Sequence, residues 1–203
     1  MRRSIMFAVV GMSLAFAASA SADDQFHPMP PAPGQDGTFE LRTLHYDDGV
    51  HGEMTVEVRN LGAKAATFSA RGLYFVPDDN PNTAPQRLAI VGGIRTGSED
   101  APRELISLAA GTTAKVRFDV YCIDEDRHAP ESTMTFTLAS TRLPDKLVAG
   151  IEHATVDVVK TIKLKADDDQ QRRIQPLVWQ ARRDSGVRGL KLKGDGAQER
   201  RRR

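Results

Sequence analysis

An alternation of apolar and polar residues recurs along much of the chain and restricts those segments to β-strands. In the longest run, over 113–123, every second residue of one set is apolar: Ala114, Val116, Phe118, Val120 and Cys122. The same spacing recurs at Met54, Val56 and Val58, and at Met134, Phe136 and Leu138. Successive side chains of a strand point to opposite faces, so each run predicts a strand with one face in a core.

Turn residues separate these runs at short intervals. Asp47-Asp48-Gly49 predicts a tight hairpin, in which Tyr46 would pair with His51. We expect strands near 38–46, 51–59, 64–70, 72–76, 86–92, 103–108, 113–123 and 133–139. Short strands at this spacing predict a mainly β fold, an antiparallel immunoglobulin-like sandwich over 38–140. The Cys–Trp–Cys pattern of true immunoglobulin domains is absent, so the likeness concerns architecture alone.

The period changes to that of a helix at Leu143. One helical stripe is formed by Leu143, Leu147, Ile151, Ala154, Val158 and Ile162. A second helix is expected to follow, with Ile174, Val178 and Trp179 packed back on the sheet, although Pro176 interrupts it. The sequence therefore predicts one or two C-terminal helices, a helical extension over 141–184.

Both ends of the chain differ in composition from its centre. Residues 1–22 resemble an export signal, because two arginines precede an apolar stretch and small residues, and a Pro-rich leader (23–37) follows. Residues 23–171 carry 15 basic and 24 acidic residues, whereas 172–203 carry 11 and 3. We therefore expect a secreted or periplasmic protein with no transmembrane segment after cleavage, and a disordered basic tail over 185–203.

Cys122 is the only cysteine, so it cannot form a disulfide within the chain. Three roles are open to it: a small core residue, a reactive thiol or a link between two chains. The alternation places Cys122 on the apolar strand face, where burial would raise the thiol pKa and make it inert.

Two short motifs resemble those of bacterial surface thioester domains. They are Tyr121-Cys122-Ile123, an aromatic-Cys-apolar motif, and Gln175 to Trp179, a Gln-x-x-apolar-Trp motif. The resemblance implies a thiol at Cys122 that condenses with a glutamine side chain, with Gln175, Tyr121 and Trp179 in the same core. Ile174 replaces the usual Thr, and no second apolar-Gln motif follows to supply the bonding glutamine.

Two other groups of polar residues are candidate sites. His45, Asp47, Asp48 and His51 flank one turn and could hold a divalent metal, although the hairpin turns the two imidazoles to opposite faces, which favours a solvated turn. Arg200, Arg201, Arg202 and Arg203 end the basic tail and could contact an anionic surface.

No phosphate-binding loop, nucleophile elbow or His-Glu-x-x-His helix occurs in the sequence. We therefore expect an exported, non-enzymatic binding or interaction module of the bacterial envelope or exterior. It would act on an unknown protein or glycan partner, without a cofactor and without nucleic acid. A thioester-type covalent adhesin that uses Cys122, and a structural accessory that docks through its basic tail, are the alternatives.

Overall fold

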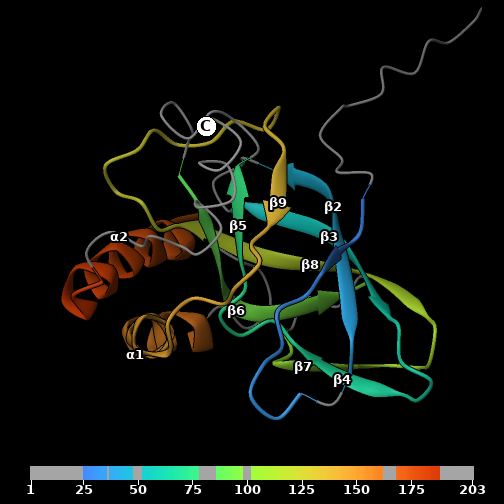
Figure 1. Ribbon diagram of the computed structural model, residues 1–203. Helices are drawn as coiled ribbons and strands as arrows, with labels where there is room; N and C mark the ends of the chain where they lie inside the picture. The colour runs from blue at the N-terminus through green and yellow to red at the C-terminus, as the bar shows by residue number, and fades with distance from the viewer. Residues whose placement is uncertain are drawn as a thin grey trace, which may run out of the picture.

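The computed structural model describes residues 25–35, 37–47, 52–77, 86–97, 102–161 and 168–187. It is mainly β, with antiparallel sheets followed by two helices, as the sequence predicts (Figure 1). The strands are β1 (His27–Pro28), β2 (Phe39–Asp47), β3 (Glu53–Asn60), β4 (Ala66–Ser69), β5 (Tyr74–Pro77), β6 (Leu88–Thr96), β7 (Leu105–Leu108), β8 (Thr113–Cys122) and β9 (Phe136–Leu138). The helices are α1 (Asp145–Thr161) and α2 (Asp168–Ser185).

The larger sheet has seven strands in the order β1-β2-β3-β8-β6-β5-β9, and it curls until its ends approach. Strand β9 lies beside β2, where the rings of Phe136 and Tyr46 meet edge to face with centroids 5.1 Å apart. The result is a nearly closed, barrel-like sheet and not clearly the immunoglobulin-like sandwich that the sequence predicts.

Two irregularities in register help the sheet to curl. One falls in β2 between Thr43 and His45, and the other falls in β6 between Ile90 and Ile94. The second contains Gly92 and Gly93, both at positive φ, and a Cβ on Gly93 would lie 2.8 Å from the Arg103 carbonyl oxygen. Bulges of this kind bend a strand and increase its twist.

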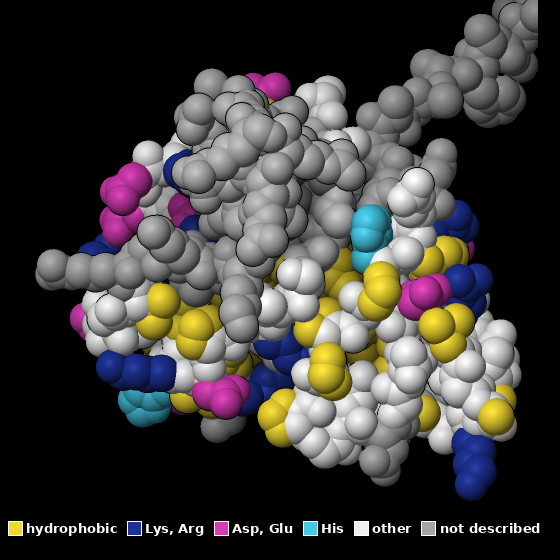
Figure 2. All heavy atoms as spheres, in the orientation of Figure 1, with side chains coloured by type: hydrophobic (Ala, Val, Ile, Leu, Met, Phe, Trp, Pro, Cys, Tyr) yellow, Lys and Arg dark blue, Asp and Glu magenta, His cyan; other side chains and the backbone are white. Residues whose placement is uncertain are grey.

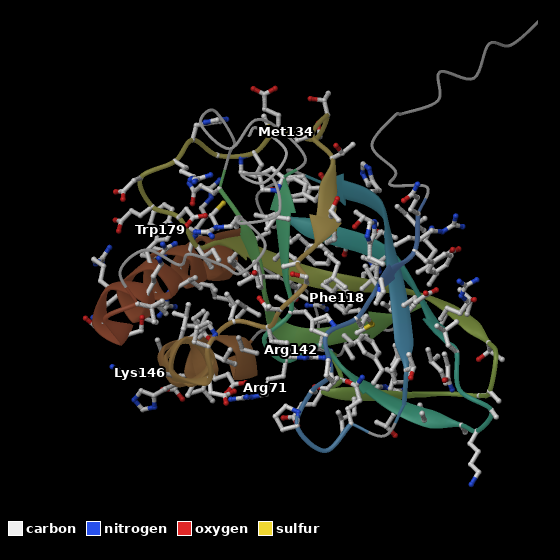
Figure 3. All side chains as sticks on the ribbon, viewed as in Figure 1. Arg71, Phe118, Met134, Arg142, Lys146 and Trp179 are labelled. Carbon is white, nitrogen blue, oxygen red and sulfur yellow. The ribbon has the colours of Figure 1, made fainter. Side chains whose placement is uncertain are left out.

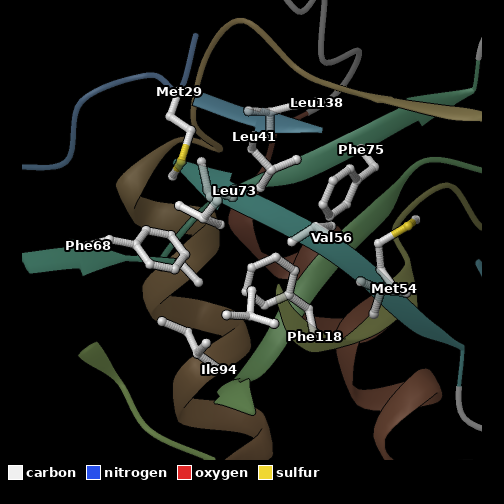
Figure 4. Close-up of a cluster of buried hydrophobic side chains, with 14 of the residues drawn as sticks. Met29, Leu41, Met54, Val56, Phe68, Leu73, Phe75, Ile94, Phe118 and Leu138 are labelled. Carbon is white, nitrogen blue, oxygen red and sulfur yellow. The ribbon is translucent and has the colours of Figure 1, made fainter. Parts of the chain in front are cut away.

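The barrel encloses an inner core of buried apolar side chains (Figure 4). It includes Leu41, Met54, Val56, Phe75, Ile94, Phe118 and Leu138. The small sheet formed by β4 and β7 covers this core at one side, because Phe68 of β4 packs against Phe39 and Phe118. The alternation that predicts β3 and β8 thus corresponds to their inward faces.

A second, outer core lies between the sheet and the two helices. Its members are Tyr74, Ala89, Val91, Tyr121, Ile123, Ala139, Leu143, Leu147, Val148, Ile151, Val158, Ile174, Val178 and Ala181. The predicted helical stripe is confirmed from Leu143 to Val158, and Ile162 lies outside the described residues. Trp179 is half-buried and does not belong to this core, although Ile174 and Val178 do.

The eight predicted strands correspond to β2–β9, with most ends within two residues, although β6 runs four residues further than expected. One local expectation is wrong: Asp47 pairs with Glu53, so Tyr46 faces Met54 and not His51. The Pro-rich leader is also part of the sheet, because β1 pairs His27 with Leu41 inside it. Among the described helices, none has the length and apolarity needed to cross a membrane.

The outer core yields a stability prediction. Leu147 of α1 is fully buried, so Leu147→Ala should lower the free energy of unfolding by about 2–4 kcal/mol through lost burial and a residual cavity. Val156 of the same helix is 37% exposed, so Val156→Ala should change stability by less than about 1 kcal/mol. Urea denaturation of the two variants measures both values. Equal losses would show that α1 does not pack as described.

Candidate functional site

The end of β8 meets α2 through the side chain of Gln175. Its Oε1 accepts a hydrogen bond from the Cys122 backbone N–H at 2.9 Å, and its Nε2 donates to the Cys122 carbonyl at 2.7 Å. The amide therefore satisfies both backbone groups of Cys122, as a neighbouring strand would. The two motifs, 53 residues apart in sequence, are thereby brought together.

A buried carboxylate lies next to this contact. Asp124 is 5% exposed, and Arg87 donates to its two oxygens from Nε and Nη2, each at 2.6 Å. Arg182 of α2 donates to the same carboxylate and to the Ile123 carbonyl. Burial alone would raise the pKa of Asp124, but the hydrogen bonds and charge of Arg87, with Arg182, lower it to about 2.

The thiol of Cys122 is shielded at this junction. The residue is partly buried and packs against the inner core. Burial, with a smaller contribution from the negative charge of Asp124, raises the thiol pKa to about 11. The thiol is therefore protonated at neutral pH, which agrees with the effect that the apolar surroundings predict.

The remaining residues of the two motifs, Tyr121 and Trp179, lie on β8 and α2. Tyr121 is 5% exposed and belongs to the outer core, on the face of β8 opposite Cys122. Trp179 lies on α2 (Figure 3), and its buried indole N–H has no hydrogen-bond partner within the described residues. Both amide atoms of Gln175 are engaged with the backbone, so Gln175 positions Cys122.

The predicted metal ligands and the C-terminal arginines are not brought together into a site within the described residues. His45 and Asp47 are exposed on β2, whereas Asp48 and His51 lie outside the described residues. Across the described ranges, no three His, Cys, Asp or Glu side chains group as metal ligands. Arg200, Arg201, Arg202 and Arg203 also lie outside these ranges, so contact with an anionic surface stays a prediction.

A groove along α1 is the second candidate site, and sequence reasoning missed it. Its first hollow, of about 530 Å³, lies between residues 32–35, β4 and the start of α1. Its second hollow, of about 680 Å³, lies between α1, the Gly92–Gly93 bulge and β7. The hollows share six lining residues, which makes them one continuous groove: Ser69, Arg71, Gly72, Leu105, Leu143 and Val148.

Arg71 spans this α1 groove at the junction of its two hollows. Its Nε donates to Glu152 at 2.8 Å, its Nη2 donates to the same carboxylate at 3.0 Å, and its Nη1 lies 3.5 Å from Asp145. Figure 3 shows Arg71 and Arg142 near each other between α1 and β4, and Figure 2 shows a hollow there with basic side chains at its floor. Sequence alone gives little signal for this site, because its residues come from distant segments.

No protein-family model matches this chain, and no curated protein matches it. The candidate sites therefore stand on their own geometry.

The Gln175 contact yields a testable prediction. In Gln175→Glu, a carboxylate oxygen replaces the Nε2 donor and faces the Cys122 carbonyl, so stability should fall by about 1–3 kcal/mol. Alkylation of Cys122 by iodoacetamide at pH 8 should become at least about tenfold faster, because α2 no longer packs against the end of β8 and the reagent can reach the thiol.

Gln180→Glu is the matched control, because Gln180 is exposed on the same helix. It should leave both the stability and the alkylation rate near those of the wild type. If the two variants alkylate at the same rate, Gln175 does not protect the thiol.

Proposed function

We propose that this chain is an exported, non-enzymatic binding module whose ligand site is the α1 groove. The observation that carries the proposal is the apolar surface of the groove. Leu105 (53% exposed) and Val156 (37% exposed) are two of the three large apolar side chains exposed in the described chain, and both line it. Apolar residues exposed together in a concave surface are typical of a binding site.

The interior of the groove is suited to holding a ligand. Val148 and Ile151 of α1 form one apolar wall, and Ile90 and Val91 of β6 form part of the other. Polar groups that could fix orientation stand at the junction of the hollows, where Arg71 meets Glu152. Apolar walls with a few placed polar groups are the usual composition of a ligand pocket.

Export is supported by the sequence of residues 1–22, which lie outside the described part of the structure. If this segment is a cleaved signal, the mature chain begins at Asp23 and the groove faces the periplasm or the exterior. A protein or glycan of the envelope is then the expected partner.

The proposal predicts that groove variants lose binding to the envelope. Purified mature protein (23–203) is incubated with isolated envelope fractions of the source cell, and the retained fraction is measured. Wild-type protein should be retained, whereas Leu105→Glu and Val156→Glu should lose most of the retention, because each places a charge in the groove.

Leu61→Glu serves as the matched control, since Leu61 is 46% exposed and does not line the groove. It should bind as the wild type does. Equal retention of all the variants, or a chain that keeps residues 1–22 in the cytoplasm, would contradict the proposal.

A thioester-type covalent adhesin is the second candidate, favoured by the hydrogen bonds between Gln175 and the Cys122 backbone. In such a bond the Cys122 sulfur would attack the amide carbon of a glutamine, and ammonia would leave. Because both amide atoms of Gln175 are engaged with the backbone, another glutamine would have to supply the acyl group.

Intact mass separates the two candidates. A thioester would leave the mature protein about 17 Da lighter than its sequence, and methylamine would add to the acyl group and release the thiol. We expect the unmodified mass, since the thiol is shielded and protonated. A deficit that Cys122→Ala abolishes would establish the adhesin instead.

A further inference from the structure

Arg142, which lines the first hollow of the α1 groove, is a partly buried cation that pairs with no acidic residue of the described ranges. Its guanidinium donates to four neutral oxygens: the Pro30 carbonyl at 2.9 Å, the Ser69 carbonyl at 3.1 Å, Gln35 Oε1 at 3.4 Å and the Arg71 carbonyl. In the described part of the chain, no carboxylate lies within ion-pair distance of it. By contrast, the buried Arg87 and Arg95 each pair with an aspartate, at 2.6 and 2.7 Å.

The surroundings of Arg142 add further positive charge to the first hollow. Arg71 adds a second guanidinium to the hollow, and burial, followed by repulsion from Arg71, lowers the pKa of Arg142 to about 10. The amino-terminal end of α1, the positive end of its dipole, lines the same hollow through Asp145. Among the described residues that line the hollow, Asp145 is the only acidic one, and it already pairs with Arg71.

Donor groups remain for a ligand. Nη1 of Arg142 carries two protons and, among the described residues, makes one hydrogen bond, to the Arg71 carbonyl. Nη1 of Arg71 likewise makes one contact, with Asp145. A ligand oxygen in the hollow could therefore accept N–H groups from both guanidiniums, and a negative charge there would offset the desolvated cation.

We propose that the α1 groove binds an apolar peptide segment through its free C-terminal carboxylate, which sits in the first hollow against Arg142 and Arg71. The apolar residues that precede the carboxylate lie in the second hollow, along Leu105, Val156 and Ile151. This proposal rests on the proposed function, since it assigns a ligand class to the same groove. A peptide fits better than a single small acid because the charged and apolar hollows adjoin.

The test compares two peptide mixtures that differ in one group. One is a mixture of fluorescent hexapeptides of Ala, Val and Leu with free C-terminal carboxylates, and the other is the same mixture as C-terminal amides. Fluorescence anisotropy with wild-type protein should show at least about tenfold tighter binding of the carboxylates. The preference should weaken as salt rises, because it depends on charge.

Variants of the two charged groups in the first hollow locate the effect. Arg142→Gln should abolish the preference, but it also breaks contacts with Pro30 and Ser69. Asp145→Asn therefore provides an independent test, because this side chain is 85% exposed and its removal makes the hollow more positive. It should strengthen binding of the carboxylates about two- to threefold and leave binding of the amides unchanged.

Three results would overturn the assignment. Equal affinity for both mixtures would show that the groove does not recognise the C-terminal carboxylate. If decanoate displaces the peptides and binds with higher affinity than they do, the ligand of the groove is a fatty acid and not a peptide. An undiminished preference in Arg142→Gln would show that Arg142 does not hold the carboxylate.

The outcome for the proposed function remains separate. If neither mixture binds, yet Leu105→Glu and Val156→Glu still abolish envelope retention, the peptide assignment is wrong and the binding module stands. If retention does not depend on these residues either, both proposals fail.

Discussion

The second half of β8 is buried on both faces, and the rest of the structure is arranged around it. Val116, Phe118 and Val120 point into the inner core, whereas Tyr121 and Ile123 point into the outer core. Because backbone at the centre of two cores cannot be hydrated, every polar group along it needs a protein partner. Where the outer face carries charge, the partner is another buried group: Asp119 pairs with Arg95 at 2.7 Å.

The last residues of β8 show how this requirement joins the sheet to the helices. Strand β3 pairs with β8 only as far as Asp119, and the Gly52 carbonyl then accepts the Val120 N–H. Beside Cys122, no strand of the described chain lies on that side, and the Gln175 amide takes its place. Shielding of the thiol follows from this contact, while Asp124, Arg87 and Arg182 fix the chain beyond it. The same packing sets α1 beside β6 and β7, where the groove lies.

Local patterns predicted the elements well and their assembly less well. The alternation at 113–123 and the stripe from Leu143 to Val158 report burial directly, because the side-chain period follows from backbone geometry. Curling of the sheet depends on bulges at Thr43 and at Gly92–Gly93, and on the approach of Phe136 to Tyr46, which no short window of sequence contains. The predicted register of the β2–β3 hairpin is wrong because the connection between these strands is longer than Asp48-Gly49 suggests. The contacts of Arg142 could not be predicted from local sequence, because its partners lie 71 to 112 residues away.

Hydrogen exchange at Cys122 tests the central claim, that α2 completes the edge of β8. The Cys122 N–H donates to a side chain of α2, whereas the Ile123 N–H donates to the Arg87 carbonyl in the neighbouring chain segment. If α2 docks as described, both amides should be protected to a similar degree, by at least about a thousandfold over an unfolded chain. Rapid exchange at Cys122 beside slow exchange at Ile123 would show that α2 does not hold the end of β8.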